Sequence, residues 1–539
     1  MRETAELRVL IRTTDDMPIS NPIIPGFHPD PSICRAGDDF YIVNSTFEWF
    51  PGVPVHHSRD LKNWRHIGHI LTRQSQLDLR GVTDSAGVWA PSLSHADGRF
   101  WLVYTNIRNT GMGRPFKDIK IFLTTAEDIL GPWSEPLELD SIGFDPSLFH
   151  DDDGKKYLLN MEWDFRKDHY RFAGIVLQEF DAVAGKLTGP RTKILRKDNI
   201  LTEGPNLYKK DGWYYLMLAE GGTGWNHGIS AARSRNILGP YELDPQPSVL
   251  TTRHREDWWL QKAGHGEIVE TQHGEWFLAH LGSRPVGDRR CILGRETNLQ
   301  RVTWHDGWLH LENGGILPDQ EIHSPAGLAE HPWPERNTAD DFDAASLDIS
   351  WSSLRVPVDE SWVSLSARPG WLRLTGRDSL HSFFEQSLLA KRLQHFKVTA
   401  ETRLRFAPNH FTQMAGLVFY YDTRTHYYLR VTRHEELGTV LGIVLTDDGA
   451  YDEPGDIEVN GWPEFFLRAV IDETSLQFHA SPDGVDWRAI GPALDATKVS
   501  DDYGSILHFT GAMIGICAQD LGGCKTTADF DYFKLTPNA

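Results

Sequence analysis

Five copies of one phrase, spread over the first 300 or so residues, constrain the fold of this chain more than any other feature. The copies start at His28, Trp89, Phe144, Glu203 and Gly264. Each runs from a small or polar turn into a short strand, a glycine-containing hairpin and a second strand rich in aromatic and aliphatic residues. One column of the repeat holds Pro31, Pro91, Pro146, Pro205 and Gly266, which sets a spacing of 55 to 61 residues. A unit of this length holds about four strands, so the sequence predicts a five-bladed β-propeller.

The rest of the chain predicts a second β domain. We expect an N-terminal extension over residues 1–20 and the propeller over residues 21–317. A proline-rich and charged linker follows over residues 318–341. Residues 342–539 alternate apolar and polar positions, with turn signals every 8–12 residues, which favours a β-sandwich of the jelly-roll or concanavalin-like type. Long helical periodicity is absent, so the predicted class is all-β.

The repeat also predicts where the chemistry lies. Equivalent columns of a propeller lie at one radius near the axis, so Asp30, Trp89, Asp145, Glu203 and His265 are expected to converge. Cleavage of an acetal needs one protonated and one ionised carboxyl group. Glu203, with the longer side chain, is the expected general acid, Asp30 the general base that activates water, and Asp145 the group that tunes the pKa of Glu203. The alternative is that these carboxylates only cap turns, because Asp-Pro is a common turn initiator.

The other candidate residues leave more than one interpretation open. His265 either orients a substrate hydroxyl or holds an ion through water, and Trp89 either stacks on a sugar or plugs the channel. Phe47 stands in an apolar turn and is a candidate for the pocket wall. Arg295 either holds hydroxyls and keeps a carboxylate ionised or is an ordinary surface residue. No cofactor is required by this chemistry, although Ca²⁺ or another divalent cation near His265 in the channel is compatible with it.

Charge and cysteine content narrow the partners and the compartment. The net charge of −21 argues against nucleic acid and anionic membranes as partners. The four cysteines show no metal-ligand spacing, and buried free thiols in a reducing compartment are the favoured interpretation, with a Cys517–Cys524 pair as the alternative. The first residues lack the apolar run of a signal peptide, and no apolar stretch of 18 residues occurs, so we expect a cytoplasmic protein.

The chain resembles the glycoside hydrolase family 43 β-xylosidases along nearly its whole length from about residue 21. The likeness rests on NPIIPGFHPDPSICRAGDDF, GVWAPSLS, GFDPSLFHDDDGKKYL, TEGPNLYKKDGWYYLM, QKAGHGEIVETQHGEWFLAHL and LGRETNLQ, and continues into RPGWLRLTG, QMAGLVFYYD and DFDYF. It implies a five-bladed propeller with a C-terminal sandwich, and inversion at the anomeric carbon. The N-terminal extension has no recognised counterpart, and residues 161–172 are expected to form a specificity loop.

The resemblance also implies roles for single residues. The aspartate of the first motif, Asp30, matches the general base, Asp145 the group that modulates the pKa of the acid, and Glu203 the general acid. The arginine of GRET, Arg295, matches a substrate contact, and His265 matches a pocket residue. The family's sandwich closes the pocket with a phenylalanine, which in this chain corresponds to Phe509 of HFTGAMIG.

The predicted function is therefore an exo-acting, inverting β-1,4-xylosidase that releases xylose from the non-reducing ends of xylo-oligosaccharides. An α-L-arabinofuranosidase, or an enzyme with both activities, is the alternative within enzymes. A non-catalytic carbohydrate-binding propeller is the alternative from another class. A homo-oligomer is also expected.

Overall fold

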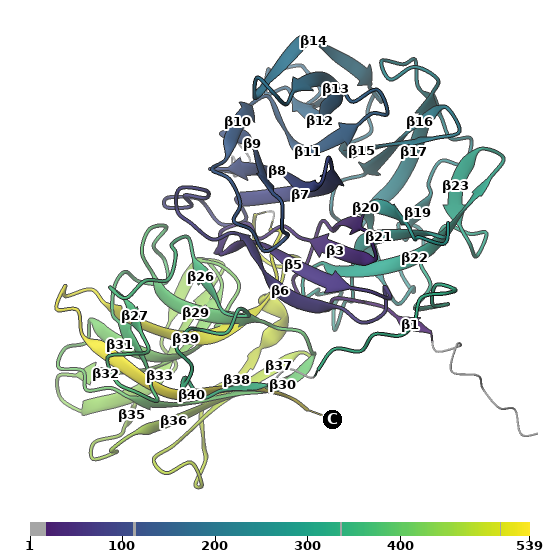
Figure 1. Cartoon of the computed structure of the whole chain (residues 1–539). Helices are drawn as coiled ribbons and strands as arrows, with labels where there is room; N and C mark the ends of the chain where they lie inside the picture. The colour runs from purple at the N-terminus through teal and green to yellow at the C-terminus, as the bar shows by residue number, and fades with distance from the viewer. Residues whose placement is uncertain (1–17, 111–114, 335–336, 507, 539) are drawn as a thin grey trace, which may run out of the picture.

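The computed structural model describes residues 18–110, 115–334, 337–506 and 508–538, and these residues form an all-β protein with two domains (Figure 1). The fold prediction is confirmed. Five antiparallel sheets follow one another along the first domain, as predicted for the blades of a propeller. In each sheet the predicted repeat supplies the first two strands as a hairpin, for example with Ile33 opposite Ile42.

The five sheets have the following strands. The first holds β2 (Ser32–Ala36), β3 (Asp39–Val43), β5 (Gly52–Ser58) and β6 (Arg65–Leu71), and the second β7 (Gly87–Ala96), β8 (Arg99–Ile107), β9 (Ile119–Ala126) and β10 (Leu137–Asp140). The third holds β11 (Gly143–His150), β12 (Lys156–Trp163), β13 (Phe172–Asp181) and β14 (Lys186–Leu195). The fourth holds β15 (Thr202–Lys210), β16 (Trp213–Glu220), β17 (Gly228–Ser234) and β18 (Glu242–Leu243), with β19 (Leu250–Thr251) beside β17. The fifth holds β20 (Gln261–Glu270), β21 (Trp276–Ser283), β22 (Glu296–His305) and β23 (Trp308–Leu311).

Burial within the blades follows the order of the strands. Nine of the ten residues of β20, a first strand, are buried, whereas most of β14, a last strand, is exposed or half-buried. A first strand is covered on both faces by neighbouring blades, so it contains few exposed polar positions. The first strands of neighbouring blades contact one another, as β2 does with β7 and β7 with β11. The first strand of each repeat therefore lies on the axis side.

The second domain is a sandwich of two antiparallel sheets. One sheet runs in the order β34 (Ala450–Asp452), β33 (Gly438–Asp447), β32 (His426–His434), β31 (Gln413–Tyr420), β39 (Met513–Asp520), β29 (Ser387–Arg392), β26 (Ser352–Leu354) and β4 (Trp49–Phe50), with β35 (Ile457–Glu458) beside β33. The other runs in the order β27 (Val363–Ser364), β28 (Leu372–Thr375), β40 (Thr527–Pro537), β30 (Lys397–Arg405), β36 (Phe465–Asp472), β37 (Ser475–Ser481) and β38 (Arg488–Asp495), with β25 (Ala339–Asp340) beside β40. A 3₁₀-helix, η1 (Ala496–Lys498), follows β38.

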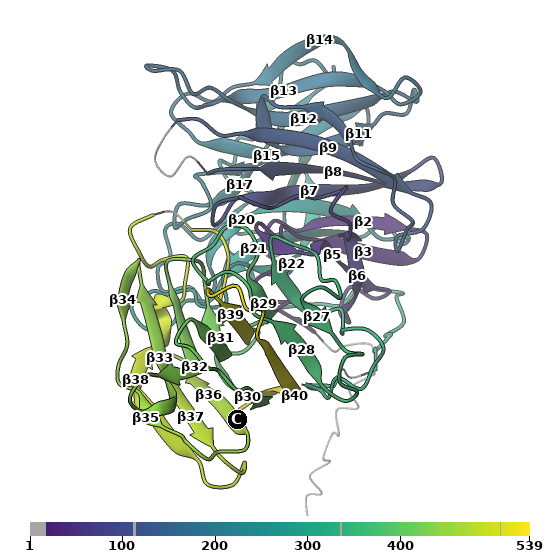
Figure 2. The same cartoon turned by 90° about the vertical axis from the view of Figure 1, so that its left-hand side faces the viewer.

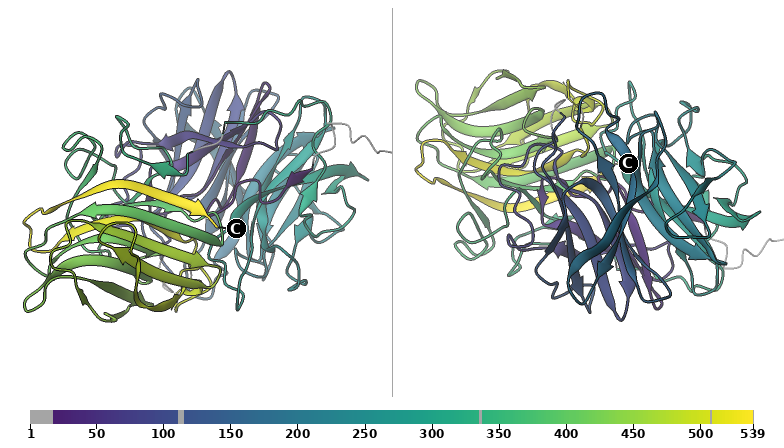
Figure 3. Two further views of the ribbon diagram at one scale, coloured as in Figure 1. Left: turned by 90° about the horizontal axis from the view of Figure 1, so that it is seen from below. Right: turned by 90° about the horizontal axis from the view of Figure 1, so that it is seen from above.

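Besides the connecting segment, strand pairing, an ion pair and hydrophobic packing join the two domains. The short strand β4 lies between β3 and β5 in sequence but pairs with β26, so it extends a sheet of the sandwich. A buried ion pair also crosses the boundary, with Nη2 of Arg355 at 2.8 Å from Oδ1 of Asp84. One hydrophobic cluster contains both propeller and sandwich residues. Figures 2 and 3 show the sandwich, in green and yellow, packed against one side of the propeller.

The segment predicted as a linker carries short strands at both ends. The strand β24 (Glu321–Ile322) pairs with β1 (Ile19–Ser20), the described end of the predicted N-terminal extension. At the other end, β25 pairs with β40 of the sandwich. Each end of the segment is therefore tied to a different part of the fold.

The cysteines are all free thiols, which confirms the favoured interpretation over a Cys517–Cys524 pair. Their expected burial is wrong at one position, because Cys524 is exposed in the turn between β39 and β40, whereas the other three are buried. In the described ranges, no helix has the length and apolar character needed to cross a membrane.

Candidate active site

A left-handed residue recurs at the axis end of every blade. Asp30, Ala90, Asp145, Gly204 and His265 all have positive φ, between 33° and 55°. This conformation is disfavoured for residues with a side chain, at a cost of about 1–3 kcal/mol each, and such strain gathers at functional sites. In blades two to five the register of the first hairpin also shifts at this point, as a β-bulge does.

The strained turn directs a side chain from each blade toward one cavity. The left-handed residue itself lines the cavity in blades one, three and five, and the residue before it does so in blades two and four. That offset explains why Trp89 and Glu203 stand one position earlier in the repeat than the others. The cavity has a volume of about 510 Å³, within the usual range for small-ligand sites. It is lined by all eight predicted site residues, Asp30, Phe47, Trp89, Asp145, Glu203, His265, Arg295 and Phe509.

Asp30 is held in the ionised form. Nη1 of Arg295 lies 2.9 Å from its Oδ1, and the hydroxyl of Ser45 donates a hydrogen bond of 2.6 Å to its Oδ2. Nδ1 of His265 lies 3.8 Å from Oδ1. Burial alone would raise the pKa of Asp30, but Arg295, His265 and Ser45 together lower it below its usual value. A buried carboxylate that is ionised at neutral pH can act as a base.

The pKa values of Glu203 and Asp145 are shifted in the opposite direction, upward. Burial and the nearby charge of Asp30 raise the pKa of Glu203, although Arg295 and Lys117 oppose the shift. Burial, Glu203 and Asp30 raise the pKa of Asp145, whose Oδ2 accepts a hydrogen bond of 3.1 Å from the backbone N–H of Gly204. Two interacting carboxyl groups titrate as a pair, so at neutral pH the pair retains a proton next to an ionised Asp30.

Arg295 connects the carboxylate to the other domain. Besides Asp30, its Nη1 donates to the hydroxyl of Thr223 at 2.7 Å, and its Nη2 donates to the carbonyl oxygen of Phe509 at 2.9 Å. Its side chain is only 3% exposed, so the surface interpretation of this arginine is wrong. The guanidinium is thus oriented by one residue of the propeller and one of the sandwich.

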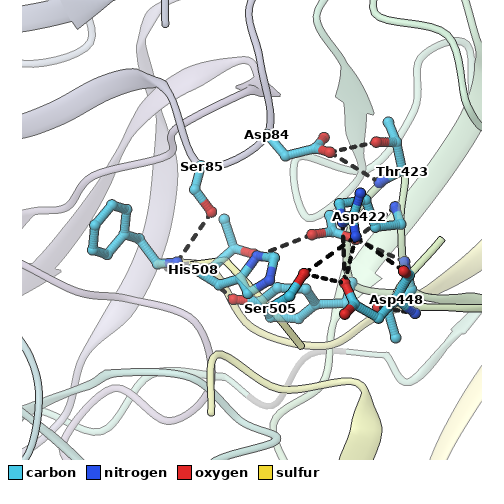
Figure 4. A network of polar contacts seen from close by, with 12 residues as sticks. Asp84, Ser85, Asp422, Thr423, Asp448, Ser505 and His508 are labelled. Carbon is cyan, nitrogen blue, oxygen red and sulfur yellow. Dashed lines mark hydrogen bonds and ion pairs between the residues drawn. The ribbon is translucent and has the colours of Figure 1, made fainter. Parts of the chain in front are cut away.

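Three aromatic rings form one wall of the cavity. The ring of Phe509 stacks on Phe47 with centroids 6.0 Å apart and meets Trp89 edge-on at 5.2 Å. The backbone of the sandwich loop is fixed from both sides, because the N–H of Phe509 donates to Ser85 of the propeller at 3.0 Å and Nδ1 of His508 lies 3.0 Å from Oδ2 of Asp422 (Figure 4). Both domains are therefore needed to complete the cavity.

The more exposed side of the cavity carries residues that the repeat does not mark. Trp163 and Phe172 line it at the two ends of the predicted specificity loop, and Arg171 is exposed beside them. Nζ of Lys117 lies 5.1 Å from the ring of Trp89 and 5.0 Å from that of Trp163. These residues lie outside the repeated position at the start of each blade. The sequence indicated only those in the predicted specificity loop, residues 161–172, and it did not indicate Lys117.

The geometry around His265 does not by itself make a metal site. Burial lowers the pKa of His265, so its imidazole is neutral. Among the described residues, the one group of three ligand side chains close enough to share an ion is Cys291, Asp501 and Asp502. The ammonium of Lys262 already lies 3.3 Å from Asp501 and 2.5 Å from Asp502 in that group. A cation near His265 stays a prediction.

Similar proteins share both domains of this chain. The Vibrio sp. protein "Xylan 1,3-beta-xylosidase" is 46% identical over 96% of this chain and 98% of its own length. The Humicola insolens protein "Xylosidase/arabinosidase 43B" is also 46% identical, with the same coverage. The crystal structure of "xylan beta-1,4-xylosidase from Bacillus Halodurans C-125" is 51% identical, covers 96% of this chain and 100% of that chain, and superposes with a TM-score of 0.94.

Family models match both domains separately. Residues 339–536 match the β-xylosidase C-terminal concanavalin A-like domain. Residues 19–309, which contain all but the last two residues of the five blades and seven of the eight predicted site residues, match glycosyl hydrolases family 43. The chain therefore belongs to glycosyl hydrolase family 43.

Proposed function

We propose that this protein is an exo-acting, inverting β-1,4-xylosidase that releases xylose from the non-reducing ends of xylo-oligosaccharides. One observation carries the proposal: the carboxyl groups of Asp30, whose pKa is lowered, and of Glu203, whose pKa is raised, line the same cavity. Hydrolysis of a glycoside needs this combination of one basic and one acidic carboxyl group. Membership of a glycoside hydrolase family and the names of the relatives support the reaction class and the sugar.

In the proposed mechanism, Glu203 donates its proton to the glycosidic oxygen as the bond to the anomeric carbon breaks. Asp30 accepts a proton from a water molecule that attacks the anomeric carbon from the opposite face. Arg295 keeps Asp30 ionised, and burial together with the negative charge of Asp30 keeps the proton on Glu203. Asp145, whose own pKa is raised by burial and by Glu203, is the group proposed to modulate the acid. An ionised Asp30 is also chemically able to attack the sugar directly, which would retain the configuration at the anomeric carbon.

The exo mode is supported by the shape of the cavity. Phe47 and Arg295 in the cavity wall are buried, whereas Phe509 and Phe172 are half-buried and Arg171 is exposed. A single terminal sugar fits against the buried wall, and the rest of the oligosaccharide extends past Glu203 toward solvent. A polymer chain passing through would meet the Phe509 wall.

Two experiments test the proposal. Proton NMR of the xylose first released from a nitrophenyl β-D-xyloside should show the α-anomer, and the β-anomer as the initial product would contradict inversion. Steady-state rates on matched nitrophenyl β-D-xyloside and α-L-arabinofuranoside should favour the xyloside. The Humicola relative, named for both activities, makes arabinofuranosidase the second candidate, which a higher rate on the arabinofuranoside would support.

Comparison of β-1,4-linked and β-1,3-linked xylobiose tests the linkage. The relatives carry both linkages in their names, so this choice needs its own measurement. We also propose that the enzyme acts as a cytoplasmic homo-oligomer and requires no cofactor. Light scattering measures the assembly, and full activity after dialysis against EDTA is the expected result for an enzyme without a required cation.

A further inference from the structure

A buried lysine, Lys262, lies beside the active site without lining its cavity. It is 3% exposed and stands three residues before His265 on β20. Its φ of 53° lies in the left-handed region, which costs free energy for a residue with a side chain. Lysine is among the residues least often buried, so its burial in a strained conformation indicates a specific task for the ammonium group.

The ammonium group of Lys262 contacts two acids of the sandwich domain. Its Nζ lies 3.3 Å from Oδ1 of Asp501 and 2.5 Å from Oδ1 of Asp502. The side chains of these two acids are 4% and 9% exposed, so the ion pairs are shielded from solvent. Burial alone would lower the pKa of Lys262, but the charge of Asp501 and those of the groups around it raise it above its usual value. The lysine is therefore a charged link between propeller and sandwich.

The same cluster holds the propeller segment that leads into Arg295. Oδ2 of Asp502 accepts a hydrogen bond of 2.9 Å from the backbone N–H of Cys291, four residues before Arg295. The N–H of Ala512 donates to the carbonyl oxygen of Ile292 at 2.9 Å. Two residues of the sandwich therefore fix the backbone just ahead of this arginine.

A loop of the fourth blade meets the ammonium group as well. Nζ of Lys262 lies 4.9 Å from the centre of the ring of Trp225, which is a cation–π contact. Trp225 stands two residues after Thr223, whose hydroxyl accepts a hydrogen bond of 2.7 Å from Nη1 of Arg295. The loop that orients one nitrogen of Arg295 is thus also in contact with Lys262.

Lys262 and Arg295 therefore bind the same two loops. Arg295 donates to a hydroxyl of the propeller loop and to a carbonyl oxygen of the sandwich loop, whereas Lys262 packs on an indole of the first and pairs with two carboxylates of the second. We propose that Lys262 is a positioning residue, which holds the two loops together and thereby keeps Arg295 oriented on Asp30. This inference rests on the proposed role of Asp30 as the base.

Loss of the ammonium group should release the sandwich loop. Two buried carboxylates would lose their cation, and an unpaired buried charge is expensive. They can move toward water or take up a proton, and burial already raises the pKa of Asp501 to about 6 although Lys262 opposes the shift. Either change breaks the contact with Lys262, so Arg295 is held less firmly and the pKa of Asp30 should rise. The titratable groups that act on Asp30 or Asp501 are Arg295, His265, His227, Glu203, Asp145, Lys262, Asp502, Cys291 and Tyr421.

The pH dependence of kcat/KM on a nitrophenyl β-xyloside tests the proposal. Lys262→Met should move the acid limb upward by about 1 pH unit, the lower end of the shift expected when a carboxyl group loses its paired cation. Lys262→Arg keeps the charge and should restore most of the native profile. A limb that stays in place in Lys262→Met would overturn the proposal, whatever happens to the melting temperature.

Lys156→Met is the matched control. Lys156 is also a buried lysine, 6% exposed, that pairs with Asp97 at 2.6 Å and lies 5.1 Å from the ring of Trp101. It lies outside the lining of the active-site cavity. Both Lys262→Met and Lys156→Met should lower the melting temperature, but only Lys262→Met should shift the acid limb. An equal shift in the control would show a general effect of lost stability and would overturn the positioning role.

Replacement of both acids cuts the same contact from the sandwich side. Asp501→Asn combined with Asp502→Asn should raise the acid limb as Lys262→Met does, and this pair of changes decides the matter if Lys262→Met does not fold. The triple variant should shift the limb no further than either, because the effects of groups in one contact are not additive. Additive shifts would overturn the proposal. A limb that moves in Arg295→Met but in none of these variants would refute this inference alone, whereas a native protein that hydrolyses no xyloside would refute the proposed function and this inference with it.

Discussion

Replacement of Arg295 by methionine should shift the acid limb of the pH–rate profile upward. In the proposed mechanism activity requires Asp30 as the carboxylate, so the rate should fall as the pH drops through the pKa of that group. Arg295 is the largest of the influences that lower this pKa, and burial acts in the opposite direction. Without the guanidinium, burial dominates and the pKa of Asp30 rises.

The size of the shift follows from the contact. Nη1 of Arg295 lies 2.9 Å from Oδ1 of Asp30, and a cation at such a distance lowers a carboxyl pKa by about 1–3 units. Each unit corresponds to about 1.4 kcal/mol. The acid limb should therefore move up by about 1–3 pH units. The basic limb should move in the same direction, because Arg295 also opposes the rise in the pKa of Glu203.

The assay is kcat/KM on a nitrophenyl β-xyloside across the acid and neutral range, since this parameter reports the ionisations of the free enzyme. Arg368→Met is the matched control, because Arg368 pairs with Asp529 at 3.0 Å in the sandwich and lies outside the active-site cavity. Its limbs should coincide with those of the native enzyme. An Arg295→Met enzyme that loses rate equally at every pH would show that the arginine only binds substrate, which would refute the proposed control of Asp30.

The remaining predictions concern the acid, the aromatic wall and the domain boundary. Glu203→Gln should lower kcat/KM on xylobiose by about 10²–10⁴-fold and much less on an activated aryl xyloside, and equal losses on both would remove Glu203 as the acid. Phe509→Ala should lower kcat/KM by about two- to tenfold, from aromatic contacts worth about 0.5–1.5 kcal/mol, with little change in melting temperature. Arg355→Met leaves the buried Asp84 without its ion-pair partner and should lower the free energy of unfolding, measured with denaturant, by about 3–5 kcal/mol. Arg80→Met, at an exposed ion pair, should lower it by less than about 1 kcal/mol.

The repeat predicted the site because its period places one residue of each blade at the axis. Asp30, Asp145 and His265 occupy the left-handed position of their repeats. Trp89 and Glu203 stand one residue earlier, and the repeat still predicted both as site residues. Position in a periodic fold was thus a stronger signal than residue type. The composition and periodicity of the last 200 residues similarly sufficed for a sandwich, because alternation reports one buried face per strand.

Features without a period were not predictable. Lys117 and Thr223 enter the cavity from loops, where no repeat marks them. The strand β4 is two residues long, too short for an alternating pattern, so its pairing with β26 left no signal in the sequence. Phe509 was located only by family resemblance, because nothing in the sandwich sequence indicates which of its loops faces the propeller.

The contact between Phe509 and Arg295 makes the sandwich part of the candidate active site. The carbonyl oxygen of Phe509 accepts a hydrogen bond from the same guanidinium that keeps Asp30 ionised, while its ring closes the aromatic wall. In the proposed mechanism, the loop that covers the bound sugar therefore also helps to set the charge of the base. Because burial and pairing with Arg295 shift the pKa of Asp30 in opposite directions, an enclosed site without an oriented arginine would hold a protonated, inactive base. In the proposed mechanism, one residue of the second domain thus links closure of the cavity to the charge of the base, and the shared sheet and the buried ion pair hold that domain against the propeller.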